Sequence, residues 1–208
     1  MTQEQIDVAV KQAIDVGAQQ RPAELSGLLQ FLADKDLESF IEIGTASGGT
    51  FGALCQAIPR GIKVAVDAWM GLAPWPRMFA PESETDPETF MTRLHRMQNY
   101  STQVCVVEGS SHEDTTRDKV RWALEGNLVG FMLIDGDHRY EGAKLDYARY
   151  SQFVRPGGYI GFHDVNDTEF ARSKGCFVGQ LWNELQGNKV EFNEHGHNMG
   201  IGVIQYEP

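Results

Sequence analysis

The sequence has few of the features that mark nucleic-acid-binding, membrane-spanning and secreted proteins. Basic residues are scarce, because 18 Lys and Arg stand against 29 Asp and Glu and give a formal net charge of −11. A nucleic acid or an anionic membrane surface needs a basic face on its partner, so we expect no binding to either. No apolar run approaches the roughly 20 residues that span a bilayer, and the polar, acidic N-terminus does not resemble a signal peptide.

Cysteine is also scarce. Cys55, Cys105 and Cys176 lie far apart in the chain and form no metal-binding spacing. An odd, unclustered set of cysteines predicts reduced thiols rather than a disulfide framework or a zinc site. Together with the lack of a signal peptide, this predicts a cytoplasmic protein.

The chain has instead the composition and patterning of a globular α/β protein. Its 208 residues are 41% hydrophobic and 23% charged, which predicts one domain over residues 1–208. Apolar residues at helical spacing predict a pair of N-terminal helices within residues 1–36. Short apolar runs that stop at polar or glycine residues predict five strands, at residues 39–43, 63–66, 104–107, 130–134 and 159–162. Helical patterns fall between and after them, near residues 50–57, 87–99, 117–124, 140–153 and 178–185.

The order of these segments predicts the fold class. Strand and helix alternate five times, which requires a parallel sheet with helices on both faces. Residues 156–158 (Pro-Gly-Gly) predict a turn before the fifth strand, and residues 190–193 and 200–206 predict two last strands joined as a hairpin. We therefore expect a Rossmann-like, doubly wound α/β fold, with a mostly parallel seven-stranded sheet and an antiparallel final hairpin.

The segment 69–86 interrupts this alternation. It combines several prolines with large apolar side chains and one arginine, namely Trp69, Trp75, Arg77, Met78 and Phe79. Such a segment can close over a substrate pocket, pack on the body of the domain or form a subunit interface. A substrate lid and a homo-oligomer therefore both stay open.

Polar and glycine residues follow the predicted strands, at the edge of the sheet where doubly wound folds bind their ligands. Gly44 and Gly48 follow the first strand and allow the backbone to turn sharply beside an anionic group, although a tight strand-to-helix turn needs glycine as well. Asp67 ends the second strand about 20 residues later, where an acid can accept hydrogen bonds from ribose hydroxyls or cap a turn. The spacing is not G-x-G-x-x-G, which disfavours a nicotinamide-dependent oxidoreductase.

Three motifs at these strand ends resemble one enzyme superfamily. They are E-I-G-T-A-S-G-G-T at residues 42–50, L-I-D-G-D-H-R-Y-E-G-A-K-L-D at 133–146 and R-P-G-G-Y-I-G-F-H-D-V at 155–165. The chain, from about residue 21 to 206, is similar to the class I S-adenosylmethionine-dependent methyltransferases. It resembles a bacterial branch of that superfamily, which is close to the small-molecule O-methyltransferases of the catechol, caffeoyl-CoA and macrocin types and to cephalosporin-hydroxylase-like proteins. The resemblance implies S-adenosylmethionine as cofactor and a small hydroxylated metabolite as methyl acceptor.

The resemblance also implies which residues hold the cofactor. The loop after the first strand holds the methionine portion, through Glu42, Gly44, Thr45, Ser47 and Gly48. The remaining contacts come from the ends of the second, third and fourth strands, with Asp67 at the ribose, Ser111 and His112 beside the adenine, and Asp135 nearby.

A metal site and a catalytic base are the two further implications. In metal-dependent relatives a divalent cation, such as Mg²⁺ or Mn²⁺, is bound at positions that match Asp135, His163 and Asp164. Histidine at the second of these positions departs from the all-oxygen set and suits Mn²⁺, Fe²⁺ or Zn²⁺ better than Mg²⁺. The departure also leaves open that no metal binds and that His163 is the base or a packing residue.

Methyl transfer to oxygen requires that the acceptor lose a proton, so a histidine beside the reacting atoms can serve as general base. His138 and His163 both satisfy this requirement by their location, whereas His195 and His197 in the last hairpin are interpreted as turn residues. A metal-independent enzyme, a nitrogen-directed methyltransferase and a non-catalytic cofactor-binding protein stay open as alternatives.

Overall fold

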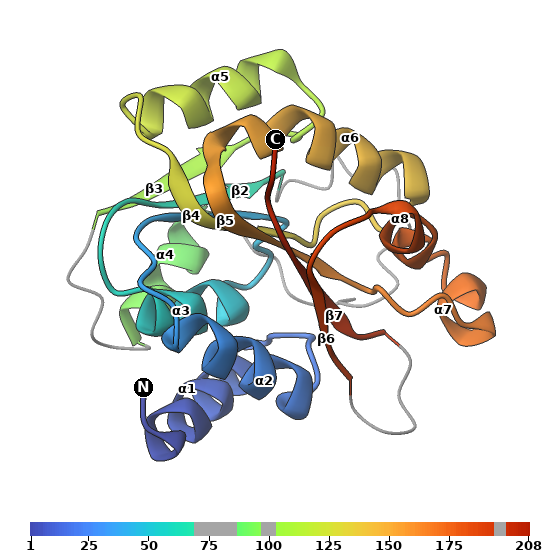
Figure 1. The fold of residues 1–208 in the computed structure, drawn as a ribbon. Coiled ribbons are helices and arrows are strands. Elements are labelled where there is room, and N and C mark those ends of the chain that lie inside the picture. The colour runs from blue at the N-terminus through green and yellow to red at the C-terminus, as the bar shows by residue number, and fades with distance from the viewer. Residues whose placement is uncertain (69–86, 97–102, 194–198) are drawn as a thin grey trace.

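Seven strands form a single sheet in the computed structural model, which describes residues 1–68, 87–96, 103–193 and 199–208 (Figure 1). The strands are β1 (Phe40–Ile43), β2 (Lys63–Asp67), β3 (Val104–Glu108), β4 (Val129–Ile134), β5 (Val154–His163), β6 (Lys189–Phe192) and β7 (Ile201–Gln205). Their order is β3-β2-β1-β4-β5-β7-β6, in which β1 to β5 are parallel and β7 is antiparallel to both of its neighbours. The predicted fold class is confirmed.

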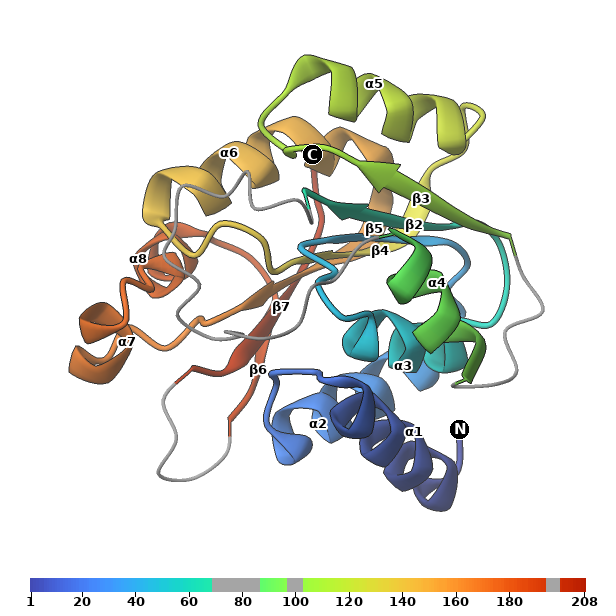
Figure 2. The same cartoon turned by 180° about the vertical axis from the view of Figure 1, so that it is seen from behind.

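Helices cover both faces of the sheet (Figures 1 and 2). One face packs against α1 (Gln3–Val16), α2 (Pro22–Ala33), α3 (Gly49–Ala57) and α4 (Pro87–Arg96). The other face packs against α5 (Asp114–Ala123), α6 (Tyr140–Tyr150) and α8 (Val178–Glu184). A short helix, α7 (Glu169–Ser173), precedes α8, and a single 3₁₀ turn, η1 (Ser151–Phe153), follows α6.

The central strands are buried along their whole length because both faces are covered, and apart from Glu42 in β1 their residues are apolar or glycine. All four residues of β1 and all six of β4 are buried, the pattern expected of parallel strands inside an α/β sandwich. Ile43 of β1 pairs with Val66 of β2 and with Ile134 of β4, so these three strands end at the same level. This register brings the residues that follow the three strands to one place.

The structure differs from the sequence prediction at the start of β5. Residues 156–158 were predicted to form a turn, but they lie within β5. Val154 pairs with Val129 and Tyr159 with Phe131, so the intervening residues are accommodated as an irregularity in the strand. Pro-Gly-Gly is typical of turns and of strand bulges alike, and only the pairing partners distinguish the two.

Two helices, α5 and α6, have other bounds than predicted, and the short helix α7 was not predicted. α5 begins three residues earlier than predicted, at Asp114, and α6 ends at Tyr150, where η1 takes over. The five residues of α7 are too few to show a helical period in the sequence.

Within the described ranges, no helix is both long and apolar enough to cross a membrane. The expectations for the segment 69–86 as a lid, and for His195 and His197 as turn residues, lie outside the described residues.

Candidate active site

The ends of the parallel strands surround a cavity of about 360 Å³. Its walls come from the segments that follow β1 to β5 and from residues 17–20, which connect α1 to α2. Most of the residues predicted to bind cofactor or to act as base line this cavity: Gly44, Thr45, Ser47, Asp67, Ser111, His112, Asp135, His138 and His163. Glu42, Gly48 and Asp164 lie behind its walls.

The glycine loop after β1 depends on two glycines for different reasons. Gly44 has φ of 86°, and a Cβ there would lie 2.1 Å from the carbonyl oxygen of Asp135. Gly44 therefore allows the loops after β1 and β4 to approach closely. Gly48 also has φ of 86°, but a Cβ there would meet the ring of Phe90, so this glycine serves packing against α4.

Asp67 connects the end of β2 to the glycine loop. Its Oδ2 accepts a hydrogen bond of 2.6 Å from the backbone amide of Ala46. The carboxylate is thereby held at the cavity wall, where a ligand's hydroxyl groups can reach it.

Glu42 is a buried acid directly behind this loop. Only 1% of its surface is exposed, and neither carboxylate oxygen has a hydrogen-bond partner among the described residues. Burial raises the pKa of Glu42 well above its ordinary value, and the negative charges of Asp135 and Asp67 raise the pKa further. Glu42 therefore favours its neutral form, and the negative charge at this wall of the cavity comes from Asp67 and Asp135, which favours a ligand that carries positive charge.

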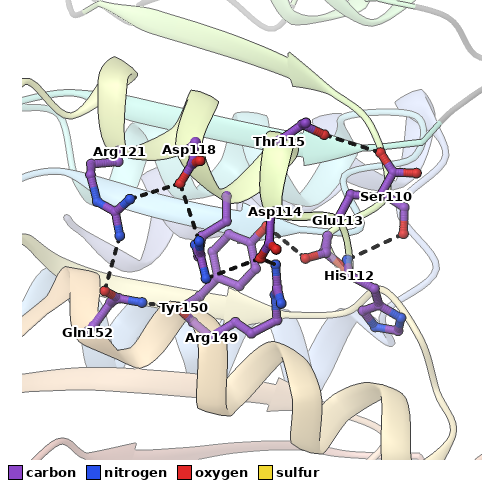
Figure 3. A network of polar contacts seen from close by, with 12 residues as sticks. Ser110, His112, Glu113, Asp114, Thr115, Asp118, Arg121, Arg149, Tyr150 and Gln152 are labelled. Carbon is purple, nitrogen blue, oxygen red and sulfur yellow. Dashed lines mark hydrogen bonds and ion pairs between the residues drawn. The ribbon is translucent and has the colours of Figure 1, made fainter.

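The turn after β3 contributes Ser111 and His112 to the lining of the cavity. Figure 3 shows His112 of this turn together with Ser110 and with Tyr150 of α6. The hydroxyl of Tyr150, from α6, donates to the carbonyl oxygen of Ser111 at 3.0 Å, and the backbone amide of His112 donates to the hydroxyl of Ser110 at 3.3 Å. Nε2 of His112 lies 3.5 Å from Oδ1 of Asp146, a fully buried acid on α6. Tyr150 and Asp146 of α6 therefore hold this turn in place.

Asp135, His163 and Asp164 meet at the ends of β4 and β5, as predicted. Nδ1 of His163 lies 2.9 Å from Oδ1 of Asp135 and 3.3 Å from Oδ1 of Asp164. Burial lowers the pKa of His163, but the charges of the two carboxylates and the hydrogen bond to Asp135 outweigh it and raise the pKa to about 10. His163 is therefore a protonated group between two acids, and this arrangement argues against the base role that the sequence left open for it.

His138 pairs with the other oxygen of Asp164. Nδ1 of His138 lies 2.8 Å from Oδ2 of Asp164, and the histidine side chain is 33% exposed. Burial lowers the pKa of His138, but the hydrogen bond to Asp164 and the charge of that carboxylate outweigh it and move the pKa above its ordinary value. His138 is thus an oriented histidine that a ligand in the cavity can reach.

The backbone of Asp164 is held in an unusual conformation. Its φ of 63° lies in the left-handed region, which residues other than glycine rarely adopt. Its amide donates to the carbonyl oxygen of Gly200 at 2.8 Å. Backbone strain of this kind is typical of functional sites, where surrounding structure fixes a side chain in one direction.

The predicted metal ligands contact one another and Gln20, and a cation at Asp135, His163 and Asp164 stays a prediction. The two oxygens of Asp135 are occupied by His163 and by the amide of Gln20, and Nδ1 of His163 faces both carboxylates. Over the described ranges, a different group has the spacing of metal ligands: His138, Asp164 and Cys176, whose ligand atoms all lie within 4.8 Å of one another. Burial raises the pKa of the Cys176 thiol, so without a cation this residue is neutral, and its Sγ donates to the carbonyl oxygen of Lys174 at 4.0 Å.

Three residues of the site were not predicted: Gln20, Asp146 and Cys176. Asp146 belongs to the motif at 133–146, and its place three residues after Ala143 and four before Tyr150 could have suggested an inward-facing helical position. Gln20 and Cys176 lie far from the strand-end motifs, and no local pattern distinguishes them.

Comparison with solved structures agrees with the fold. The O-methyltransferase TomG of Streptomyces achromogenes, in complex with SAM, matches 99% of this chain and 90% of its own, with a TM-score of 0.61 and 14% identity. An O-methyltransferase of Bacillus cereus, in complex with SAH, matches 96% of this chain and 91% of its own, with a TM-score of 0.61 and 15% identity. At these identities the likeness shows the fold.

Comparison with sequences gives the family. An uncharacterised protein of Acanthamoeba polyphaga mimivirus is 24% identical over 75% of this chain and 64% of its own length. An uncharacterised protein of Sinorhizobium fredii is 25% identical over 77% of this chain and 16% of its own length. The chain thus spans less than two thirds of these relatives. The profile of a family described as a methyltransferase domain matches residues 41–165, which is more than half of the chain. In agreement with its strand-end motifs, the chain belongs to this methyltransferase-domain family.

Proposed function

We propose that this protein transfers the methyl group of S-adenosylmethionine to a hydroxyl oxygen of a small metabolite, with His138 as general base. The observation that carries the proposal is the pair formed by His138 and Asp164, 2.8 Å apart, at the wall of the strand-end cavity. The family, the O-methyltransferases of similar fold and the acidic cavity all support it.

The cavity has the chemistry that a cationic adenosyl compound requires. S-adenosylmethionine, when bound, supplies an electrophilic methyl group on a positively charged sulfur. Asp67 offers a carboxylate to the ribose hydroxyls, and the close approach at Gly44 leaves the loop backbone free to contact the amino-acid portion. The carboxyl groups of Asp67 and Asp135 line the same region, which favours the cation over the neutral product. Ser111 and His112 also line the cavity and would contact the adenine.

His138 can take the proton that a hydroxyl acceptor loses. Asp164 accepts from Nδ1 of His138, which fixes the tautomer and directs the second ring nitrogen to a substrate. His163, as an imidazolium, offsets the charge of Asp135 and of Asp164. Asp164 can therefore remain ionised in a buried position, and its pKa lies well below its ordinary value despite burial because of His163 and His138. An ionised Asp164 in turn stabilises the protonated form of His138 after proton transfer.

A second candidate keeps the cofactor and adds a cation. The observation that favours it is the group of His138, Asp164 and Cys176, which has one nitrogen, one oxygen and one sulfur at metal-ligand spacing. Such a donor set suits Zn²⁺ or Fe²⁺ rather than Mg²⁺. The two candidates exclude each other, because Nδ1 of His138 cannot donate to Asp164 and bind a cation at once.

The proposal is tested by methyl transfer from labelled S-adenosylmethionine into an extract of small metabolites. The native protein should label an acceptor, and His138→Gln should reduce the rate by about 10²–10⁴-fold, the usual contribution of a general base. His95→Gln, on α4 and away from the cavity, is the matched control and should keep the native rate. Binding of S-adenosylmethionine without any transfer would identify a non-catalytic binding protein. Transfer that His138→Gln leaves unchanged would remove His138 from the reaction.

A further inference from the structure

A continuous series of polar contacts links the connection between α1 and α2 to His138. The hydroxyl of Thr50 donates to Oε1 of Gln20, and Nε2 of Gln20 donates to Oδ2 of Asp135 at 2.6 Å. Oδ1 of Asp135 contacts His163 at 2.9 Å, His163 contacts Asp164 at 3.3 Å, and Asp164 contacts His138 at 2.8 Å. Gln20 precedes the part of the chain that the family profile matches, residues 41–165.

Gln20 suits its place in this series because its side chain has one donor end and one acceptor end. Asp135 as a carboxylate can only accept, so the amide nitrogen of Gln20 must face it. The amide oxygen then faces Thr50, whose hydroxyl can donate. Only 4% of the surface of Gln20 is exposed, so water does not compete freely for these contacts.

The backbone around Gln20 is also fixed. Gly17 caps the C-terminal end of α1, with φ of 110° and with its amide donating to the carbonyl oxygen of Ala13. A Cβ on Gly49, at the start of α3, would lie 2.4 Å from that carbonyl oxygen and 2.7 Å from the amide nitrogen of Ala18. The end of α1 therefore packs directly on the start of α3, and this places Gln20 beside Thr50.

We propose that Gln20 is a positioning residue of the active site, which fixes Asp135 and, through His163 and Asp164, the orientation of His138. The inference rests on the proposed function for its catalytic consequence. Without Gln20, Asp135 would keep one of its two described side-chain contacts and could rotate about its side-chain bonds. His163 would then follow Asp135 away from Asp164, and the carboxylate of Asp164 would no longer be held in the direction of His138. The N-terminal helices are, on this inference, part of the catalytic apparatus.

The test is a double-mutant cycle between Gln20 and Asp135. Gln20→Met keeps the volume of the side chain and removes both hydrogen bonds. It should lower the rate of methyl transfer at saturating S-adenosylmethionine by about tenfold or more, while the KM for S-adenosylmethionine changes by less than about threefold. In the Asp135→Asn background the same substitution should lower the rate by less than about twofold, because Gln20 acts through Asp135. Equal losses in both backgrounds would overturn the proposal.

The matched control is Gln12→Met. Gln12 also makes a contact between α1 and α3, accepting from Gln56 at 3.1 Å, but it does not line the cavity. It should keep the native rate, and both variants should remain folded by circular dichroism. A rate loss as large in Gln12→Met as in Gln20→Met would mean that loosening of the helix pair, rather than Gln20 itself, causes the effect.

A measurement that needs no turnover separates this inference from the proposed function. The Nδ1 proton of His163, held by Asp135, should give a downfield proton resonance in the native protein. The resonance should move or broaden in Gln20→Met and stay unchanged in Gln12→Met. An unchanged resonance in Gln20→Met would overturn the inference about Gln20, whereas failure of the native protein to transfer methyl groups would overturn the proposed function.

Discussion

Asp146 gives a prediction about stability that can be worked out from the structure. Its side chain is fully buried, and it faces Ser111 and His112 from α6. Burial raises the pKa of Asp146, and Ser111 and the charge of His112 counteract burial only in part. With the smaller effects of Asp137, which raises the pKa, and Arg149, which lowers it, the net pKa is about 6. The folded protein therefore holds a proton on Asp146 at pH values where the unfolded chain has lost it.

The direction of the pH dependence follows from this difference. Above pH 6 the folded state carries an ionised, buried carboxylate that the unfolded chain would expose to water, so ionisation destabilises the fold. The penalty is fully present above the folded-state pKa and disappears as the pH falls toward the ordinary pKa of about 4. Because the pKa of Asp146 is about two units higher in the folded protein, its ionisation lowers the free energy of unfolding by about 3 kcal/mol at pH 8 and by roughly half of that at pH 5.

Asp146→Asn removes the ionisation and keeps the shape of the side chain. The variant should be more stable than the native protein by up to about 3 kcal/mol at pH 8, with an advantage of about half that size at pH 5, in urea unfolding followed by circular dichroism. Asp7→Asn, which changes an exposed acid on α1, should remain within about 0.5 kcal/mol of the native protein at both pH values. Destabilisation by Asp146→Asn at pH 8 would refute the reasoning, because the contacts of the carboxylate would then outweigh its burial.

The remaining predictions concern the cavity. Gly44→Ala combines a left-handed backbone with a Cβ 2.1 Å from a carbonyl oxygen, and should abolish cofactor binding and cost more than about 2 kcal/mol of unfolding free energy. Gly126→Ala, with φ of 82° and nothing within 4 Å, is its control and should cost only about 1 kcal/mol in the same unfolding experiment. Asp67→Asn should weaken S-adenosylmethionine binding by about 1.5–3 kcal/mol in calorimetry, and unchanged affinity would remove Asp67 from the site. Chelation by EDTA should leave methyl transfer intact if His138 is the base, and loss of activity that Zn²⁺ or Mn²⁺ restores would contradict that assignment.

The fold could be predicted from the sequence because its central strands are recognisable as short, mainly apolar segments. β1 and β4 are short, mainly apolar runs that stop at Gly44 and at Asp135, and such runs in alternation with helices leave few topologies. The position of the site followed from the same alternation, since parallel strands deliver their last residues to one edge. Residues 156–158 were misassigned because their pairing with a distant strand is not visible locally.

The chemistry of the site was less predictable. His138 and His163 were both candidates for the base because each lies beside acidic residues at the end of a predicted strand. Their roles separate only in three dimensions, where His163 faces two carboxylates and His138 faces one. Gln20 contributes from a segment 115 residues away from Asp135, and such contacts depend on how helices pack rather than on any motif.

The complex with S-adenosylhomocysteine, the product of the proposed reaction, tests the central claim most directly. A crystal structure of this complex should place the homocysteine portion along the loop that begins at Gly44, the ribose hydroxyls at Asp67 and the adenine at Ser111 and His112. The sulfur should face the part of the cavity that His138 lines, with space between them for an acceptor hydroxyl. A ligand bound outside the strand-end cavity, or bound with its sulfur directed away from His138, would contradict the account.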